Sequence, residues 1–224
     1  MCESAVLFLD ANTLVSPVTR TLVIAGARTE GLQVVWSAHV ENEADRHARG
    51  AASLVSTVRT DILGMELSPS SISDDGLLTA SAEDRQVVAD AIRAGTRYLI
   101  TTDVDDFALG DLAKHQMSAV NPDYFMAQCY SERAYREGVG LLAEVARNPP
   151  RTEADVHRML GRRHPYLTAR FDRLYDTTPV PADPDQPRLL FRGLTCLRCG
   201  SPLNDQAKGA LLGLCGRHQG RDPD

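Results

Sequence analysis

Short apolar runs alternate along this chain with longer, more polar segments. Four apolar runs predict strands at 5–9, 33–36, 98–101 and 117–120. Helices are expected between them, because serine N-caps or helix-starting prolines open several of these segments. The expected helices cover 17–29, 51–64 and 81–94 and begin near 37 and 122, with a loop over 67–80. This order predicts an α/β fold with an open parallel sheet of about four to five strands and helices on both faces.

After residue 130 the sequence predicts helices, followed by a linker and a small module. One helix is expected over 131–147, the segment NPP then breaks it, and one or two helices follow across 152–175. Four prolines between Thr177 and Pro187 exclude a continuous helix there. The predicted units are an α/β domain over 1–130, a helical extension over 131–176, a proline-rich linker over 177–190 and a small module over 191–224.

Carboxylates stand where the predicted strands end and where two helices begin. Asp10 follows the first strand and Asp103 the third, while Glu43 and Asp84 lie near helix starts. Residues that follow parallel strands meet at one edge of a sheet. Carboxylates gathered there repel one another unless a divalent cation neutralises them. The pattern favours a Mg²⁺ or Mn²⁺ site and chemistry on a phosphate.

Each acidic residue also has a structural interpretation. Asp10 can cap a turn, Glu43 can be a solvated helix charge, and Asp84 can complete a capping box with Ser81. Asp90 is expected at the surface. The order and placement of the whole set favour a joint role over these separate ones.

The formal charge of −6 is unevenly divided. Residues 1–130 contain 9 Lys and Arg against 18 Asp and Glu, whereas residues 131–224 contain 15 against 12. Contacts to phosphate are therefore expected mainly from the C-terminal part. No apolar run approaches the roughly 20 residues of a membrane helix, and the N-terminus lacks a signal peptide's basic flank. We expect a cytoplasmic protein that does not bind membranes.

Three of the five cysteines lie in the last 30 residues. They form a C-x2-C-x15-C-x2-H pattern, whose members are Cys196, Cys199, Cys215 and His218. Two close pairs predict a tetrahedral, structural Zn²⁺ site, the alternative being two exposed thiol pairs. Cys2 and Cys129 are expected to take no part. Nearby arginines mildly favour nucleic acid as a ligand of this module.

Five separated motifs resemble the PIN domain, and more narrowly the bacterial PIN branch found among toxins of toxin–antitoxin pairs. They are L-D-A-N-T-L-V-S-P from 9, W-S-x-x-V-x-x-E-A from 36, D-R-x-V-x-A-x-A-I-x-A-G from 84, I-T-T-D-V-x-D-F from 100 and N-P-D-Y-F from 121. The resemblance covers about 5–130. It implies an endoribonuclease that uses Mg²⁺ or Mn²⁺. The C-terminal Cys/His module separately resembles a zinc ribbon or knuckle appended to such a domain.

The resemblance also implies a role for individual residues. The metal ligands would be Asp10, Glu43, Asp84, Asp103 and Asp106, and the supporting residues Asn12 and Thr102. Glu41 is expected to face elsewhere, and Asp105 is a possible substitute for its acidic neighbours. The implied partners are an RNA substrate, an antitoxin protein and a second copy of the chain.

Two other functions are compatible with parts of this pattern. A non-catalytic adaptor would use the PIN-like and zinc-binding parts only to hold RNA or protein. A haloacid-dehalogenase-like phosphatase would use Asp10 as a nucleophile, since Thr13 follows it closely. That chemistry needs a lysine before the final aspartates, and none lies between Asp10 and Asp103.

Overall fold

The computed structural model describes residues 5–49, 54–72, 76–146, 148–178, 189–203 and 213–219. It is an α/β structure built on a five-stranded sheet with the strand order β2-β1-β3-β4-β5. The four strands predicted from the sequence are β1 (Val6–Leu9), β2 (Gln33–Val35), β3 (Tyr98–Ile100) and β4 (Ser118–Val120), and all their pairings are parallel. The predicted α/β class and parallel strands are confirmed.

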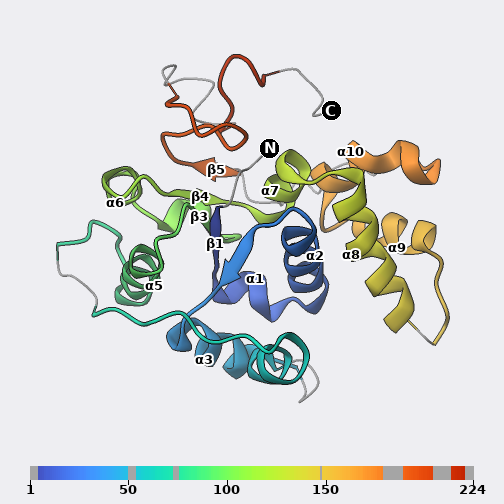
Figure 1. Cartoon of the computed structure of the whole chain (residues 1–224), viewed down its shortest axis with the longest axis horizontal. Helices are drawn as coiled ribbons and strands as arrows, with labels where there is room; N and C mark the ends of the chain where they lie inside the picture. The colour runs from blue at the N-terminus through green and yellow to red at the C-terminus, as the bar shows by residue number, and fades with distance from the viewer. Residues whose placement is uncertain are drawn as a thin grey trace.

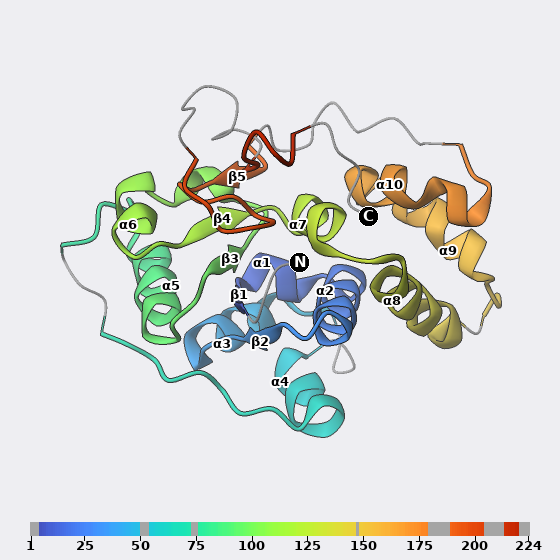
Figure 2. The ribbon, with the colours of Figure 1, turned by 45° about the horizontal axis from the view of Figure 1, so that its top comes forward.

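The central strands are apolar along their whole length because both faces of the sheet are covered. Leu7, Phe8 and Leu9 of β1 are fully buried, and so are the side chains of β3. Figures 1 and 2 show α2 (Pro17–Thr29) on one side of these strands and α5 (Ala82–Arg93) on the other. This double layer holds the carboxyl ends of β1 and β3 rigidly side by side.

Serine caps start the helices that flank the sheet. The hydroxyls of Ser16, Ser37 and Ser81 accept hydrogen bonds from the third residue beyond each cap. They begin α2, α3 (Ala38–His47) and α5, in agreement with the sequence. Pro122 begins α7 (Pro122–Cys129) after the cap Asn121. Local capping chemistry therefore sets these boundaries.

The structure differs from the expected elements in three places. The helix expected over 51–64 is a short α4 (Val55–Thr57) that continues as the π-helix η2 (Val58–Leu63), and residues 50–53 lie outside the described residues. Two short helices were not expected, α1 (Ala11–Val15) and α6 (Leu109–Lys114). Helix α1 forms because the Asp10 carboxylate accepts a hydrogen bond from the Ala11 N–H and so caps it. Asp90, expected at the surface, is fully buried and accepts a hydrogen bond from Ser71 N.

The C-terminal extension consists of α8 (Glu132–Val145), α9 (Glu153–Leu160) and α10 (Pro165–Tyr175). Figures 1 and 2 show α8 beside α2, with α9 and α10 beyond it. A buried polar chain joins the three helices, because Tyr135 Oη contacts His157 Nδ1 at 2.7 Å and His157 Nε2 contacts Asp172 Oδ1 at 2.9 Å. The extension is thus one packed unit fixed against the sheet's helical layer.

The fifth strand comes from the segment predicted as a separate module. β5 (Phe191–Arg192) pairs antiparallel with β4, and Phe191 is buried. Most of the predicted linker, 179–188, lies outside the described residues. None of the described helices is long and apolar enough to cross a membrane.

Close packing between α2 and Tyr130 gives a test of this arrangement. A Cβ added at Gly26 would lie 2.1 Å from Tyr130 Cε2, on a ring whose hydroxyl donates to Val23 O at 2.8 Å. We expect Gly26→Ala to lower the free energy of unfolding by about 1–3 kcal/mol through overpacking. Denaturant titration of wild type and variant would measure this change in the free energy of unfolding.

Gly140→Ala on α8 is the matched control. The nearest atom to its new Cβ is 3.7 Å away, so the substitution should stabilise the helix by roughly 0.5–1 kcal/mol. Equal effects of the two substitutions would contradict the packing described for Gly26.

Candidate metal centres at the sheet edge and in the C-terminal module

Asp10 is a buried carboxylate at the carboxyl end of β1. It is 8% exposed, its Oδ1 accepts from Ala11 N at 2.7 Å, and its Oδ2 accepts from the Thr101 hydroxyl at 2.8 Å. Burial raises its pKa to about 7; the two hydrogen bonds oppose this rise, and the charges of Glu43 and Asp84 add to it. Asp10 is therefore held in place at an electrostatic cost.

A hydrogen-bonded chain connects Asp10 to Asp103. Asn12 Nδ2 donates to Thr101 Oγ1 and to Asp103 Oδ2, both at 2.9 Å, and Asp103 N donates to Thr101 Oγ1 at 3.1 Å. Thr102 contributes its N–H, which donates to Asn12 Oδ1 at 3.1 Å. Asn12 thus stands between the two strand ends, as a supporting residue would.

Thr101 was not among the predicted site residues. Its hydroxyl contacts Asp10 directly, whereas the hydroxyl of Thr102 lies 3.4 Å from Asp103 Oδ1. The only sequence signal is the Thr-Thr pair that follows the third apolar run. Which threonine faces Asp10 depends on the register between β1 and β3, and a single strand does not reveal that register.

Glu43 and Asp84 extend the acidic group from two helices. Both are partly exposed, and both lie close enough to raise the pKa of Asp10 through charge repulsion. Asp84 also takes part in capping α5, because its N–H donates to Ser81 Oγ at 2.9 Å and the Ser81 hydroxyl donates to its carboxylate. Its capping role and its place in the acidic group are therefore compatible.

Glu41 has a different role from Glu43. It is buried, and its carboxylate pairs with Arg59 Nε at 2.6 Å and accepts from Trp36 Nε1 at 3.0 Å. These contacts neutralise its charge inside the fold. The expectation that Glu41 faces away from the acidic group agrees with this geometry.

Asp106 lies on the exposed turn η3 (Val104–Asp106). Although Asp106 is exposed, slight desolvation by its neighbours raises its pKa; the charges of Asp84, Asp103 and Asp105 add to the rise, and Arg192 opposes it. Arg192 of β5 also holds this turn, since its Nη1 donates to Asp105 O at 3.2 Å and to Phe107 O at 2.8 Å. The strand from the C-terminal module therefore supports the acidic turn.

Together, the predicted acidic residues form an electrostatically coupled group at one edge of the sheet. Oxygen donors of this kind suit Mg²⁺ or Mn²⁺, and Mg²⁺ usually keeps several waters between itself and protein groups. Among the described residues, however, these carboxylates do not form a group of three or more that could directly hold a metal ion.

The C-terminal Cys/His set is a compact group of ligand atoms. Those of Cys196, Cys199, Cys215 and His218 all lie within 4.8 Å of one another. Cys199 and Cys215 Sγ are 3.7 Å apart, and His218 Nδ1 is 3.3 Å from Cys215 Sγ and 3.4 Å from Cys196 Sγ. A tetrahedron with Zn–S bonds of about 2.3 Å has S···S edges near 3.8 Å. The set can hold a metal such as zinc with all four positions filled by protein.

This cluster is attached directly to the α/β part of the chain. Tyr98 Oη of β3 donates to Leu197 O at 2.9 Å, and Arg198 Nη2 donates to Gln128 Oε1 of α7 at 2.9 Å. Leu197 is fully buried. Of the remaining cysteines, Cys129 lies in α7 and is not one of the clustered ligands, and Cys2 lies outside the described residues.

Comparison of the chain with family models, curated proteins and solved structures finds no match. Its function therefore has to be inferred from the two candidate metal centres and their surroundings.

The raised pKa of Asp10 predicts how stability depends on pH in protein without Mg²⁺ or Mn²⁺. A pKa near 7 in the folded state, against about 4 when unfolded, means that folded Asp10 keeps its proton longer. Stability should therefore fall as pH rises from about 4 to 7, by up to about 4 kcal/mol from this group.

Asp10→Asn should remove this fall in stability with rising pH. At pH 8 we expect the variant to be more stable than wild type by about 1–3 kcal/mol, because the buried charge is gone. The gain is smaller than the full cost of that charge, since Asn cannot accept both hydrogen bonds and loses about 1 kcal/mol. At pH 5 the two proteins should differ little. Denaturant titrations at both pH values, with bound zinc left in place, would measure the difference. A variant less stable than wild type at pH 8 would contradict the predicted cost.

The C-terminal cluster predicts about one zinc per purified full-length chain. Cys199→Ser should lose this zinc and lower the melting temperature by at least about 2–4 °C, the shift expected for 1 kcal/mol in a chain of this size. Metal analysis and thermal melting would be compared with Cys129→Ser, which removes a thiol outside the cluster. A zinc content that is unchanged in Cys199→Ser would rule out the assignment.

Proposed function

We propose that this protein is an Mg²⁺- or Mn²⁺-dependent endoribonuclease with a PIN-like α/β domain. The observation that carries the proposal is the buried Asp10 carboxylate, fixed by Ala11 N and Thr101 Oγ1 and coupled to the charges of Glu43 and Asp84. A strongly perturbed acid next to other acids is typical of a functional site. The motifs shared with PIN ribonucleases support the same conclusion.

The reaction is hydrolysis of a phosphodiester bond. A bound divalent cation would lower the pKa of an attacking water and neutralise charge that develops on the phosphate. Asp10 would hold the cation from its fixed position. Asn12 and Thr101 would fix the side chains of Asp10 and Asp103 relative to each other through hydrogen bonds. Water adds to phosphorus, one P–O ester bond breaks, and the departing ribose oxygen takes up a proton.

Glu43, Asp84 and Asp106 would complete the acidic border of the site. Their partial or full exposure leaves them open to solvent and substrate. An RNA strand carries one negative charge per nucleotide, so these acids would repel it without bound cations. Bound cations would therefore reduce this repulsion as well as assist the chemistry.

The zinc cluster would be structural. Four protein ligands leave no position open for a reacting water. Through β5 and Arg192 it would keep the turn that carries Asp105 and Asp106 in place. The narrower role of a toxin that an antitoxin inhibits is supported only by the sequence resemblance. Growth arrest on induced expression, relieved in an Asp10→Asn variant, would test it.

The direct test is cleavage of single-stranded RNA with added Mn²⁺. Asp10→Asn should lower the rate by more than about 100-fold, above the roughly 10- to 100-fold cost of disturbing a group that only supports a metal ligand. Asp176→Asn makes the same chemical change at an exposed, left-handed position after α10, which Asn tolerates, and should cleave normally.

Binding measurements on the same samples would separate the nuclease from an adaptor. RNA that is bound but left intact by wild type and Asp10→Asn alike would reject the nuclease and favour a non-catalytic RNA-binding role. RNA cleavage that persists in Asp10→Asn would show that the acidic group described here is not the active site.

A further inference from the structure

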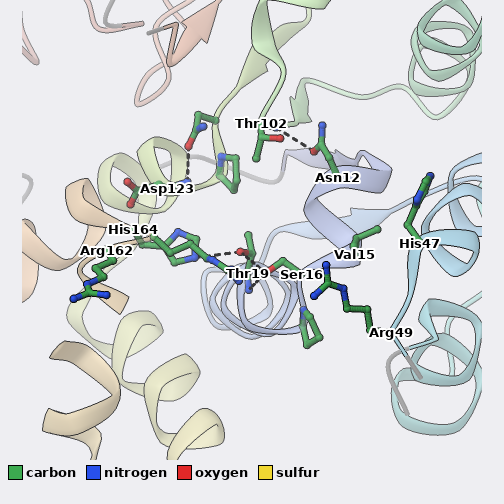
Figure 3. A pocket seen from close by; sticks show the side chains of 14 residues that line it. Asn12, Val15, Ser16, Thr19, His47, Arg49, Thr102, Asp123, Arg162 and His164 are labelled. Carbon is green, nitrogen blue, oxygen red and sulfur yellow. Dashed lines mark hydrogen bonds between the residues drawn. The ribbon is translucent and has the colours of Figure 1, made fainter. Parts of the chain in front are cut away.

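A pocket of about 700 Å³ lies beside the acidic group. Asn12 and Thr102 belong to both, so a molecule in the pocket would be continuous with one bound at Asp10. Figure 3 shows the pocket between α1 and the end of α3 on one side and the turn that joins α9 to α10 on the other. The C-terminal extension therefore supplies one wall.

The pocket is lined by more positive than negative side chains. Arg49, Arg162 and Arg163 contribute to it together with His47, and all four are exposed. Arg163 Nη1 donates to Ser16 Oγ at 3.0 Å, which draws the turn of the extension against the start of α2. These arginines are the only permanent cations among the lining residues.

The one carboxylate of this lining is buried, whereas the arginines are exposed. Asp123 is 3% exposed, its Oδ1 accepts from Leu167 N at 2.8 Å, and its Oδ2 accepts from Tyr166 N at 3.1 Å. Both oxygens thus serve the N-terminus of α10. The exposed rim is left cationic, a short distance along the surface from an acidic site that would hold metal.

His164 gives the pocket a buried polar group. It is 2% exposed, and its Nε2 lies 3.2 Å from Thr19 Oγ1. Its other ring nitrogen, Nδ1, is buried and has no hydrogen-bond partner among the described residues. A buried, unpaired ring nitrogen favours a ligand that brings a hydrogen-bonding group.

The remaining lining suits a flat, apolar ring. Val15, Pro17 and Pro122 contribute apolar surface without charge. The volume falls in the range of about 300–1,000 Å³ that small ligands usually occupy. A nucleotide combines the three features required here, since it has an anionic phosphate, a flat base and hydrogen-bonding groups on that base.

We propose that this pocket binds a nucleotide of the single-stranded RNA substrate, next to the phosphate that is cleaved. Its phosphate contacts Arg49, Arg162 and Arg163, and its base lies over the apolar lining near His164. This inference rests on the proposed ribonuclease function. It also assigns the α9–α10 turn a role in substrate binding.

The test separates binding from cleavage by using the Asp10→Asn background. A short, mixed-sequence, fluorescently labelled single-stranded RNA is titrated with protein that retains its zinc, without Mg²⁺ or Mn²⁺, at several salt concentrations. Adding Arg49→Ala or Arg163→Ala should weaken binding and reduce the slope of log K against log salt by about 0.7 for each phosphate that the protein no longer neutralises.

Arg158→Ala is the matched control. Arg158 lies on α9 outside this pocket and pairs with Asp155 at 3.0 Å, so its loss changes the net charge equally. Thermal melting checks that each variant folds. If Arg49→Ala and Arg163→Ala both match Arg158→Ala in affinity and slope, the pocket does not bind the RNA.

These experiments distinguish failure of the pocket proposal from failure of the nuclease proposal. Weaker binding in the pocket variants supports the pocket even if wild type fails to cleave RNA, which would reject only the nuclease. Arg49→Ala and Arg163→Ala made without Asp10→Asn that both cleave RNA with the wild-type KM would keep the nuclease and reject the pocket.

Discussion

The pairing of β1 with β3 is the constraint on which the candidate site depends. In this register Leu9 lies opposite Ile100, and Asp10 N donates to Ile100 O at 3.1 Å. The same register places the Thr101 hydroxyl on Asp10 Oδ2 and Asp103 within reach of Asn12. A slip by one residue would turn these side chains to the opposite face. Two segments about ninety residues apart thus create one site through a few backbone hydrogen bonds.

Burying Asp10 beside other carboxylates opposes folding, and the surrounding structure compensates. Leu7, Phe8 and Leu9 of β1 and all of β3 are apolar and buried, so the backbone at this edge has little freedom to relax. Hydrogen bonds from Ala11 and Thr101 favour the charged form, although they do not outweigh desolvation. A site kept at this cost is expected where the charge is used, since unpaired buried charges are otherwise removed.

Segments outside the predicted catalytic domain complete the surroundings of the site. β5 extends the sheet and brings Arg192 onto the turn that carries Asp105 and Asp106. The α9–α10 turn brings Arg163 to Ser16 at the start of α2. Both contacts join C-terminal residues to elements near the acidic group. Residues of the more basic C-terminal part, 131–224, therefore contribute to the surroundings of the candidate site.

Local chemistry determined much of what the sequence predicted correctly. Apolar runs mark the four parallel strands, and Ser16, Ser37 and Ser81 mark helix starts, because a strand's burial and a helix's cap depend on residues close in sequence. The spacing of Cys196, Cys199, Cys215 and His218 likewise predicts a ligand set that the structure brings together. The acidic residues could be named from their positions at strand ends and helix starts.

Tertiary structure alone decided which groups touch. The choice of Thr101 over Thr102 depends on strand register, the burial of Asp90 depends on Ser71 in a distant loop, and β5 forms only because β4 offers an open edge. The pocket exists because a turn near residue 163 packs against residue 16. The sequence by itself therefore determined the elements and the candidate ligands. The arrangement of those ligands, and the wall that the extension adds, come from long-range packing that no local pattern encodes.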